Sequence, residues 1–199
     1  MFTSVNILLQ TSNYYFDDIC ISMNNISFKG TYVAPATIYK KGEPVRATIV
    51  KVDKSDLKSL AKVVDRWDTD LSDMIVNNLY YKEVPKYKNL YALSSQTYDY
   101  KNLDDKKIHA LFEVDDDAGK YVLQYIEVDP KHQCGKNKLK QNPNRLSAVG
   151  TACLNFIKSK FAPKKMTELY ALEEAKPFYE AFGCKKAPSE TGNRYIIEP

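Results

Sequence analysis

The segment Arg145–Phe156, "RLSAVGTACLNF", decides the fold of this chain of 199 residues. From Val149 to Ile157, apolar residues recur at the spacing of one face of an amphipathic helix. Gly150, one of only 7 glycines in the sequence, stands where this helix opens. The first amides of a helix have no partner within it, and the helix dipole places roughly half a positive charge there. The small residues around Gly150 therefore predict a site where an anion approaches the backbone.

The composition is that of a globular protein whose length suits one domain, or one domain with an extension. No apolar run approaches the roughly 20 residues of a membrane span, and the first 20 residues do not resemble a secretion signal. The four cysteines lie far apart without a CxxC pair, which favours free thiols and the reducing cytoplasm. His109 and His132 lack ligand spacing to any cysteine, so no metal site is expected.

The apolar pattern becomes regular at Arg46. It predicts strands at 46–52, 89–96, 107–114, 120–128, 166–172, 183–188 and 193–198, and helices at 55–67, 71–83, 149–160 and 173–182. Antiparallel strands followed by a β-α-β unit predict an α/β fold with a single mixed sheet and helices on both faces. Residues 1–45 read as a β-rich N-terminal extension of short strands, ending in a hairpin that turns at Gly42 and packing against an exposed sheet edge.

Three motifs in this order resemble the GNAT N-acetyltransferase superfamily: "VDP" at 128–130, "RLSAVG" at 145–150 and "AKPFYEAFG" at 175–183. In that family a strand ending in V-x-P precedes Q/R-x-x-G-x-G/A at a helix start, and A-x-x-F/L-Y-x-x-x-G-F follows later. The resemblance covers residues 46–198 and implies an acetyltransferase domain at 46–199 that uses acetyl-CoA as donor and an amine as acceptor. Each motif is weak alone, and their joint order and spacing are specific.

The resemblance also implies where the donor binds. The pantetheine arm would bond to the main chain around Ile126 and Val128. The pyrophosphate would sit on the turn formed by Arg145, Ser147, Ala148, Val149, Gly150 and Thr151.

Three features depart from the family pattern. Ala148 replaces the first glycine, and its methyl group is tolerated where φ stays negative. The connection from Pro130 to Arg145 is long and basic, so Lys136, Lys138 and Lys140 become candidate ligands of the 3′-phosphate. Leu172 stands where many members carry asparagine.

Tyr179 matches the tyrosine of the family's last motif and is the candidate general acid for the departing thiolate. The candidate base is Glu127, whose side chain is expected on the strand face opposite Ile126 and Val128. Glu113 and His109 on the preceding strand, or water alone, remain alternatives for the amine proton. A backbone N–H near Val128 is the expected donor to the oxyanion.

Acceptor specificity in this family comes largely from the segment between the first two helices, here "RWDTDLSD" at 66–73. Trp67 with Asp68 and Asp73 would suit a cationic amine. Acidic residues here would equally serve as helix caps, which is the favoured role of Asp70.

Two other functions remain open: a non-catalytic acyl-CoA-binding module, and an RNA-directed acetylating toxin suggested by the basic loop. The mild net charge of +4 does not favour nucleic acid as a partner. The oligomeric state is open, with a homodimer as one option.

Overall fold

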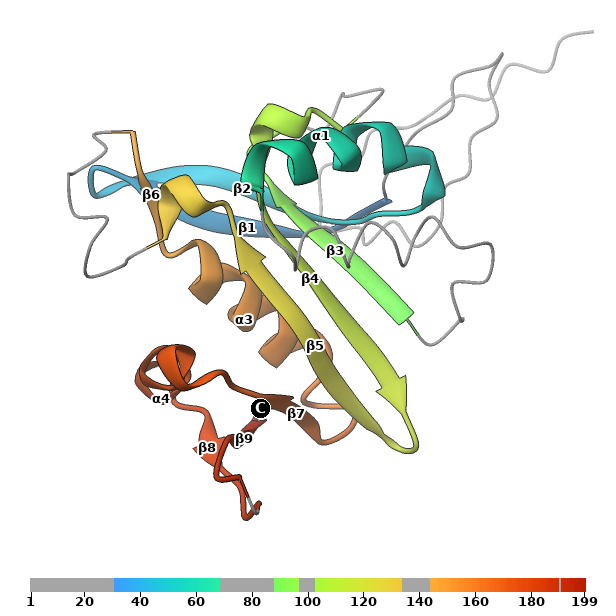
Figure 1. The fold of residues 1–199 in the computed structure, drawn as a ribbon, viewed down its shortest axis with the longest axis vertical. Coiled ribbons are helices and arrows are strands. Elements are labelled where there is room, and N and C mark those ends of the chain that lie inside the picture. The colour runs from blue at the N-terminus through green and yellow to red at the C-terminus, as the bar shows by residue number, and fades with distance from the viewer. Residues whose placement is uncertain (1–30, 69–87, 97–102, 134–143, 190) are drawn as a thin grey trace, which may run out of the picture.

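The computed structural model describes residues 31–68, 88–96, 103–133, 144–189 and 191–199. Within these ranges the strands form one nine-stranded sheet in the order β6-β1-β2-β3-β4-β5-β7-β9-β8 (Figure 1). The strands are β1 (Thr31–Lys40), β2 (Glu43–Lys51), β3 (Lys88–Ser94), β4 (Ile108–Asp117), β5 (Lys120–Val128), β6 (Leu146–Ser147), β7 (Thr167–Tyr170), β8 (Lys185–Lys186) and β9 (Arg194–Ile197). The helices are α1 (Leu57–Trp67), α3 (Val149–Lys160) and α4 (Lys176–Phe182).

The sheet separates two hydrophobic cores, one beneath α1 and one beneath α3. On β3, Leu90 and Ala92 pack with α1, whereas Tyr91 and Leu93 pack with α3. This alternation follows from the two-residue period of a strand, which directs successive side chains to opposite faces. The predicted fold class, a mixed sheet with helices on both faces, is confirmed.

Local sequence signals account for several element boundaries. The Asp53 carboxylate accepts the Ser55 N–H at 2.7 Å and forms a capping box with Asp56 ahead of α1. Lys41 and Gly42 turn β1 into β2 with positive φ values of 53° and 87°, which confirms the predicted hairpin. Residues 31–45 of the expected extension are thus continuous with the main sheet.

The order of elements along the chain also agrees with expectation, with α3 between β5 and β7 and α4 after β7. One element was missed: Leu146 and Ser147, expected to lie in a loop, form β6 and pair with Lys40 and Tyr39 of β1. The expected helix at 71–83 and the apolar runs before residue 31 lie outside the described residues. None of the helices described is long and apolar enough to cross a membrane.

The sheet opens between β5 and β7. These parallel strands pair over Tyr121–Leu123 and Thr167–Leu169. In the part of the chain that the structure describes, no strand pairs with the remainder of β5 on that side. The C-terminal half of β5 therefore presents a free edge toward the segment that leads into α4.

A buried carboxylate joins the strands on the closed side of this opening. Glu168 on β7 is fully buried and forms ion pairs with Lys120 of β5 and with Arg194 of β9, whose Nε lies 2.8 Å from Oε2. Both cations are about one-third exposed or less. Their charges offset the cost of burying Glu168.

Replacing Glu168 with glutamine should lower the free energy of unfolding by about 2–3 kcal/mol. This is less than the roughly 3–5 kcal/mol for a fully buried pair, because both cations retain solvent. Denaturant titration measures the loss, and Glu173→Gln, which removes the partner of Lys176 at a carboxylate that is 81% exposed, is the matched control. Equal midpoints for the two variants would contradict the structural role of Glu168.

Candidate functional site

The start of α3 has an unusual backbone. Ala148, its N-cap residue, adopts a left-handed conformation with φ 60° and ψ 18°. The first helical bond joins the Ala152 N–H to the Ala148 carbonyl at 2.9 Å. Because alanine has no side-chain oxygen, it cannot cap the amides of Val149, Gly150 and Thr151. A left-handed residue followed by helical ones turns successive N–H groups toward one concavity, which favours an anion.

From the sequence, alanine is tolerated at position 148 where φ is negative. The structure shows a positive φ of 60°, so that condition is not met. A left-handed alanine brings its Cβ close to the following carbonyl oxygen, at a cost of about 1–2 kcal/mol. Glycine has no such cost, which explains why the family motif carries glycine here. Strain of this kind concentrates at functional sites.

Gly150 has a packing role besides its open backbone. A Cβ atom added to it would lie 3.0 Å from Cζ of Phe178, so the ring of Phe178 occupies the space of a side chain. The absence of a side chain lets α4 approach the first turn of α3.

The free edge of β5 lies on the other side of the opening. The Asp129 N–H bonds to the His109 carbonyl on β4 at 2.9 Å. Because main-chain groups alternate in direction along a strand, those of Val128 and Ile126 point away from β4. The Val128 carbonyl accepts a hydrogen bond of 2.8 Å from Nε2 of Gln133. A donor of the amide type thus reaches this edge.

Tyr179 is 7% exposed and belongs to the core beneath α3. Its ring lies 5.2 Å from that of Phe178 and 6.3 Å from that of Tyr195. Burial raises the pKa of Tyr179 to about 12, and the neighbouring Cys184 adds to the shift. The phenol therefore remains protonated throughout the physiological pH range.

The buried carboxylates of β4 and β5 face α1. Glu127 pairs with Leu111 and Glu113 with Tyr125, and both partners belong to the core beneath α1. Ile126 and Val128 pack instead on the core beneath α3, so the expected orientation of Glu127 is confirmed. Glu127 is 7% exposed and Glu113 is 2% exposed.

His132, to which the sequence assigned no role, lies beside the turn that leads into α3. Its Nδ1 accepts the N–H of Leu146 at 3.1 Å, and its carbonyl accepts Nε of Arg145 at 3.2 Å. Its ring makes an edge contact with that of His109 at a centroid distance of 5.3 Å. Burial lowers the pKa of each histidine to about 4, and neighbouring positive charges contribute. Both rings are neutral at pH 7.

The structure describes two of the three residues that the sequence proposed for binding the amine acceptor, and they lie in different environments. Trp67 is 4% exposed in the core beneath α1, which corrects the expectation that its ring contacts an acceptor. Asp68 is exposed and ends α1 in a left-handed conformation, with its N–H bonded to the Val64 carbonyl at 2.9 Å. Asp73 and the three loop lysines, Lys136, Lys138 and Lys140, lie outside the described residues.

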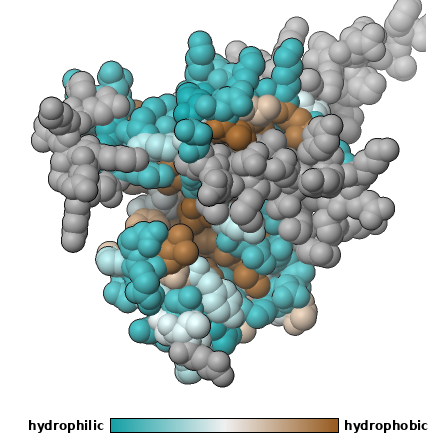
Figure 2. All heavy atoms as spheres, in the orientation of Figure 1, coloured by the Kyte–Doolittle hydropathy of each residue, from teal (hydrophilic) through white to brown (hydrophobic). Residues whose placement is uncertain are grey.

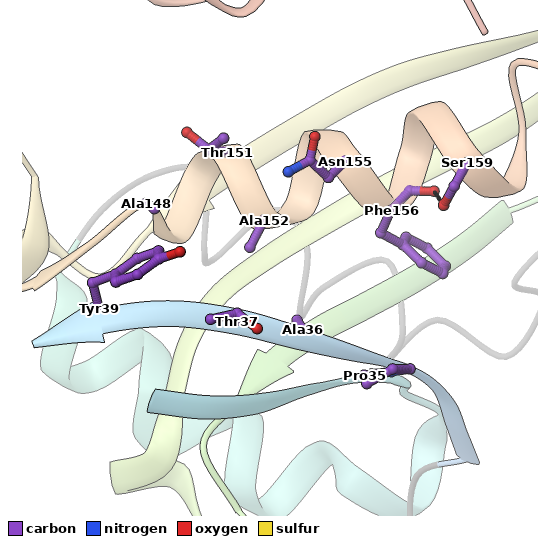
Figure 3. A pocket seen from close by; sticks show the side chains of 10 residues that line it. All are labelled: Pro35, Ala36, Thr37, Tyr39, Ala148, Thr151, Ala152, Asn155, Phe156 and Ser159. Atoms are coloured by element: carbon purple, nitrogen blue, oxygen red, sulfur yellow. Dashed lines mark hydrogen bonds between the residues drawn. The ribbon is translucent and has the colours of Figure 1, made fainter. Parts of the chain in front are cut away.

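A groove of about 600 Å³ runs between β1 and α3 (Figure 3). Ala148 and Thr151 line it at one end, so it borders the start of α3. Tyr39 of β1 projects toward the start of α3, and Asn155 and Ser159 continue the lining along the helix.

Apolar surface is exposed beside the opening. Figure 2 shows a seam of hydrophobic residues between the lobe that carries α4 and the rest of the molecule. Leu172, before α4, is 68% exposed, and Phe178 is 37% exposed. Exposed apolar groups beside polar main-chain edges are typical of a ligand-binding cleft.

No family model and no curated protein matches this sequence. Similar solved structures include the ribosomal-protein-S18-alanine N-acetyltransferase of Escherichia coli, which is 16% identical with a TM-score of 0.49 over 77% of this chain and 95% of that one. The PaiA N-acetyltransferase of Thermoplasma acidophilum in complex with coenzyme A is 15% identical, with a TM-score of 0.43 over 75% and 96%. AtaT complexed with acetyl-methionyl-tRNAfMet is 15% identical, with a TM-score of 0.47 over 76% and 94%.

The first two neighbours are N-acetyltransferases, the class that the sequence motifs resemble. With identities of 15–16% and TM-scores below 0.5, these likenesses carry no argument about the function of this chain. The inference of function therefore rests on the residues of this chain.

The two buried histidines should make the protein lose stability in mild acid. Their folded-state pKa values of about 4 lie below the unfolded value of about 6.5, so between these limits the unfolded chain binds more protons. Their contribution is complete above pH 6.5 and is lost as the pH falls toward 4. For each unit by which the pH falls between these limits, each histidine lowers the free energy of unfolding by up to about 1.4 kcal/mol.

Urea titrations at pH 7, 6 and 5 measure this dependence. Replacing His109 with asparagine should remove about half of the slope. A free energy of unfolding that stays constant from pH 7 to 5 in the wild type would show that the rings are not buried as neutral groups.

Proposed function

We propose that this protein is an acetyl-CoA-dependent N-acetyltransferase of the GNAT type, which transfers the acetyl group to a primary amine. One observation carries the proposal: three different kinds of group lie on β5, α3 and α4, the elements that precede and follow the opening between β5 and β7 along the chain. They are the uncapped amides at the start of α3, the outward main-chain edge of β5, and Tyr179 on α4.

The residues at the opening fit the donor. The amides of Val149, Gly150 and Thr151, together with Ser147 and Ala148, would hold the pyrophosphate, and Arg145 would add positive charge. The edge at Ile126 and Val128 would pair with the amides of the pantetheine arm like an added strand. The contact of Gln133 with the Val128 carbonyl supports this fit, because an amide donor already occupies that position. Lys136, Lys138 and Lys140 remain the proposed ligands of the 3′-phosphate.

When bound, acetyl-CoA supplies a thioester that a neutral amine attacks, releasing the CoA thiol. A main-chain N–H near Val128 donates to the carbonyl oxygen as it gains charge. Tyr179 donates its phenolic proton to the departing sulfur, for which its protonated state suits it. Glu127 accepts the proton that the amine loses, directly or through water.

The acceptor is a primary amine of a small molecule, a lysine or a protein N-terminus. Asp68, exposed at the end of α1, together with Asp73, would attract its cationic form. The buried carboxylates Glu113 and Glu127 lie on the same face of the sheet as α1. The acceptor would therefore approach from the α1 face, opposite α3.

The purified protein should release free thiol from acetyl-CoA when it is given a suitable amine. A panel of polyamines, aminoglycosides, lysine peptides and N-terminal peptides tests this, with a thiol reagent as readout and a thermal shift with CoA beside it. Stabilisation by CoA without thiol release for any amine would favour a non-catalytic acyl-CoA-binding module. The absence of both signals would refute the proposal.

Replacing Tyr179 with phenylalanine should lower kcat by about 10²-fold, because the thiolate then leaves without its proton donor. The ring and its packing remain, so the Kd for CoA should change little. Tyr195→Phe is the matched control, since Tyr195 is also buried and its hydroxyl donates to Glu180 at 2.7 Å. An unchanged kcat in Tyr179→Phe would exclude the tyrosine as the acid.

Replacing Ala148 with glycine should tighten CoA binding and stabilise the fold by about 0.5–1 kcal/mol. The gain is the relief of left-handed strain, less the extra entropy that glycine gives the unfolded chain. Ala118, in the β4–β5 turn with φ 43°, offers a control with the same backbone strain outside the site. Ala118→Gly should raise stability without changing the Kd measured by calorimetry. Equal effects of the two variants on CoA binding would contradict the placement of the phosphates at Ala148.

A further inference from the structure

We propose that His132 is a positioning residue that holds the phosphate-binding turn in register with the cofactor strand β5. The inference rests on the proposed function, because it concerns the same two donor-binding elements. It adds a residue that neither the motifs nor the resemblance marks.

On one side, His132 holds the entry to the turn through two hydrogen bonds. Its Nδ1 accepts the N–H of Leu146 at 3.1 Å, and both residues are buried. Its carbonyl oxygen accepts Nε of Arg145 at 3.2 Å. Arg145 and Leu146 lead directly into Ser147 and Ala148, so these bonds fix where the left-handed turn and the α3 amides begin.

On the other side, His132 is fixed to the end of β5. Its N–H bonds to the Asp129 carbonyl at 2.7 Å, and the Asp129 N–H bonds to the His109 carbonyl on β4 at 2.9 Å. The Asp129 carboxylate also accepts the Lys131 N–H at 3.1 Å, which closes a tight turn that begins at Pro130. These hydrogen bonds therefore fix His132 relative to Val128, the last residue of the cofactor strand.

The ring of His132 is positioned by the bond at Nδ1 and by packing, while its Nε2 is buried without a hydrogen-bond partner among the described residues. It packs edge-on against His109, whose Nε2 lies 2.8 Å from Oγ of Ser95 on the far side. A neutral imidazole that accepts at Nδ1 carries its proton on Nε2. Burial keeps the ring in this neutral form at pH 7. Nδ1 of His132 is thus in place as a hydrogen-bond acceptor for the Leu146 N–H without any bound ligand.

The link that His132 makes between the turn and the end of β5, here called the brace, has a physical purpose in this chain. His132 and Leu146 lie 14 positions apart in the sequence, so the hydrogen bond between them, rather than chain proximity, joins the turn to the end of β5. The donor would bridge both elements, with its pantetheine arm on β5 and its phosphates on the turn. A fixed spacing removes the entropy cost of ordering the turn at the moment of binding.

Two replacements of His132 separate the bond from the packing. His132→Phe keeps a ring against His109 but leaves the buried Leu146 N–H without its acceptor. His132→Asn can place Oδ1 where Nδ1 stood, and so keeps the acceptor.

The Kd of CoA is measured by calorimetry, and the kinetics are compared with acetyl-CoA and with S-acetylpantetheine, which lacks the phosphates. In His132→Phe the Kd of CoA and the KM of acetyl-CoA should rise about tenfold, with kcat within about twofold of the wild type. The kcat/KM for S-acetylpantetheine should not change, and His132→Asn should bind CoA within about threefold of the wild type. Wild-type affinity in His132→Phe, or an equal loss with both donors, overturns the inference.

Hydrogen exchange of the wild-type protein tests the brace even where His132→Phe does not fold. The Leu146 amide should be protected before CoA is added, and CoA should slow exchange further along, at Val149 to Thr151. A Leu146 amide that exchanges freely in the absence of CoA overturns the inference. Failure of the proposed function looks different, because wild-type protein would then bind no CoA at all.

Discussion

The short ladder between β5 and β7 is the constraint on which the candidate site depends. Three residues on each strand pair in parallel, and the buried Glu168 ties this end to Lys120 and Arg194. Beyond it β5 continues to Val128, and the main-chain groups of Ile126 and Val128 point away from β4. An unpaired strand edge usually invites aggregation. Here it lies inside the fold, where it can serve a ligand that pairs like a strand.

The start of α3 shows how backbone geometry and packing act together. Ala148 is held in a conformation that costs free energy, and the core residues around Val149 keep it there. Gly150 makes room for the ring of Phe178, so α4 packs against the first turn of α3. The glycine at this helix opening therefore permits the packing of a second helix, and in the proposed function it also permits the approach of an anion.

The buried histidines show how polar groups can define a site without touching its ligand. Burial keeps His109 and His132 neutral, and a neutral ring can accept the amide of Leu146 where a charged ring could not. The same burial lowers the free energy of unfolding in acid, because the unfolded chain binds protons that the buried rings do not. In the proposed function, the side chain of His132 sets the spacing between β5 and the start of α3, although it belongs to neither element.

Among the described elements from β2 onward, the sequence by itself determined the order of strands and helices apart from β6, together with the hairpin at Gly42, the α3 start at Val149 and the face of β5 that carries Glu127. These follow from local periodicity and turn chemistry, which each short segment carries within itself. Only the tertiary structure decided the positive φ of Ala148, the burial of Trp67, the contact of Phe178 with Gly150 and the bond from Leu146 to His132. Each of these depends on packing between segments distant in sequence or on strain that packing holds in place, and no pattern of neighbouring residues encodes it.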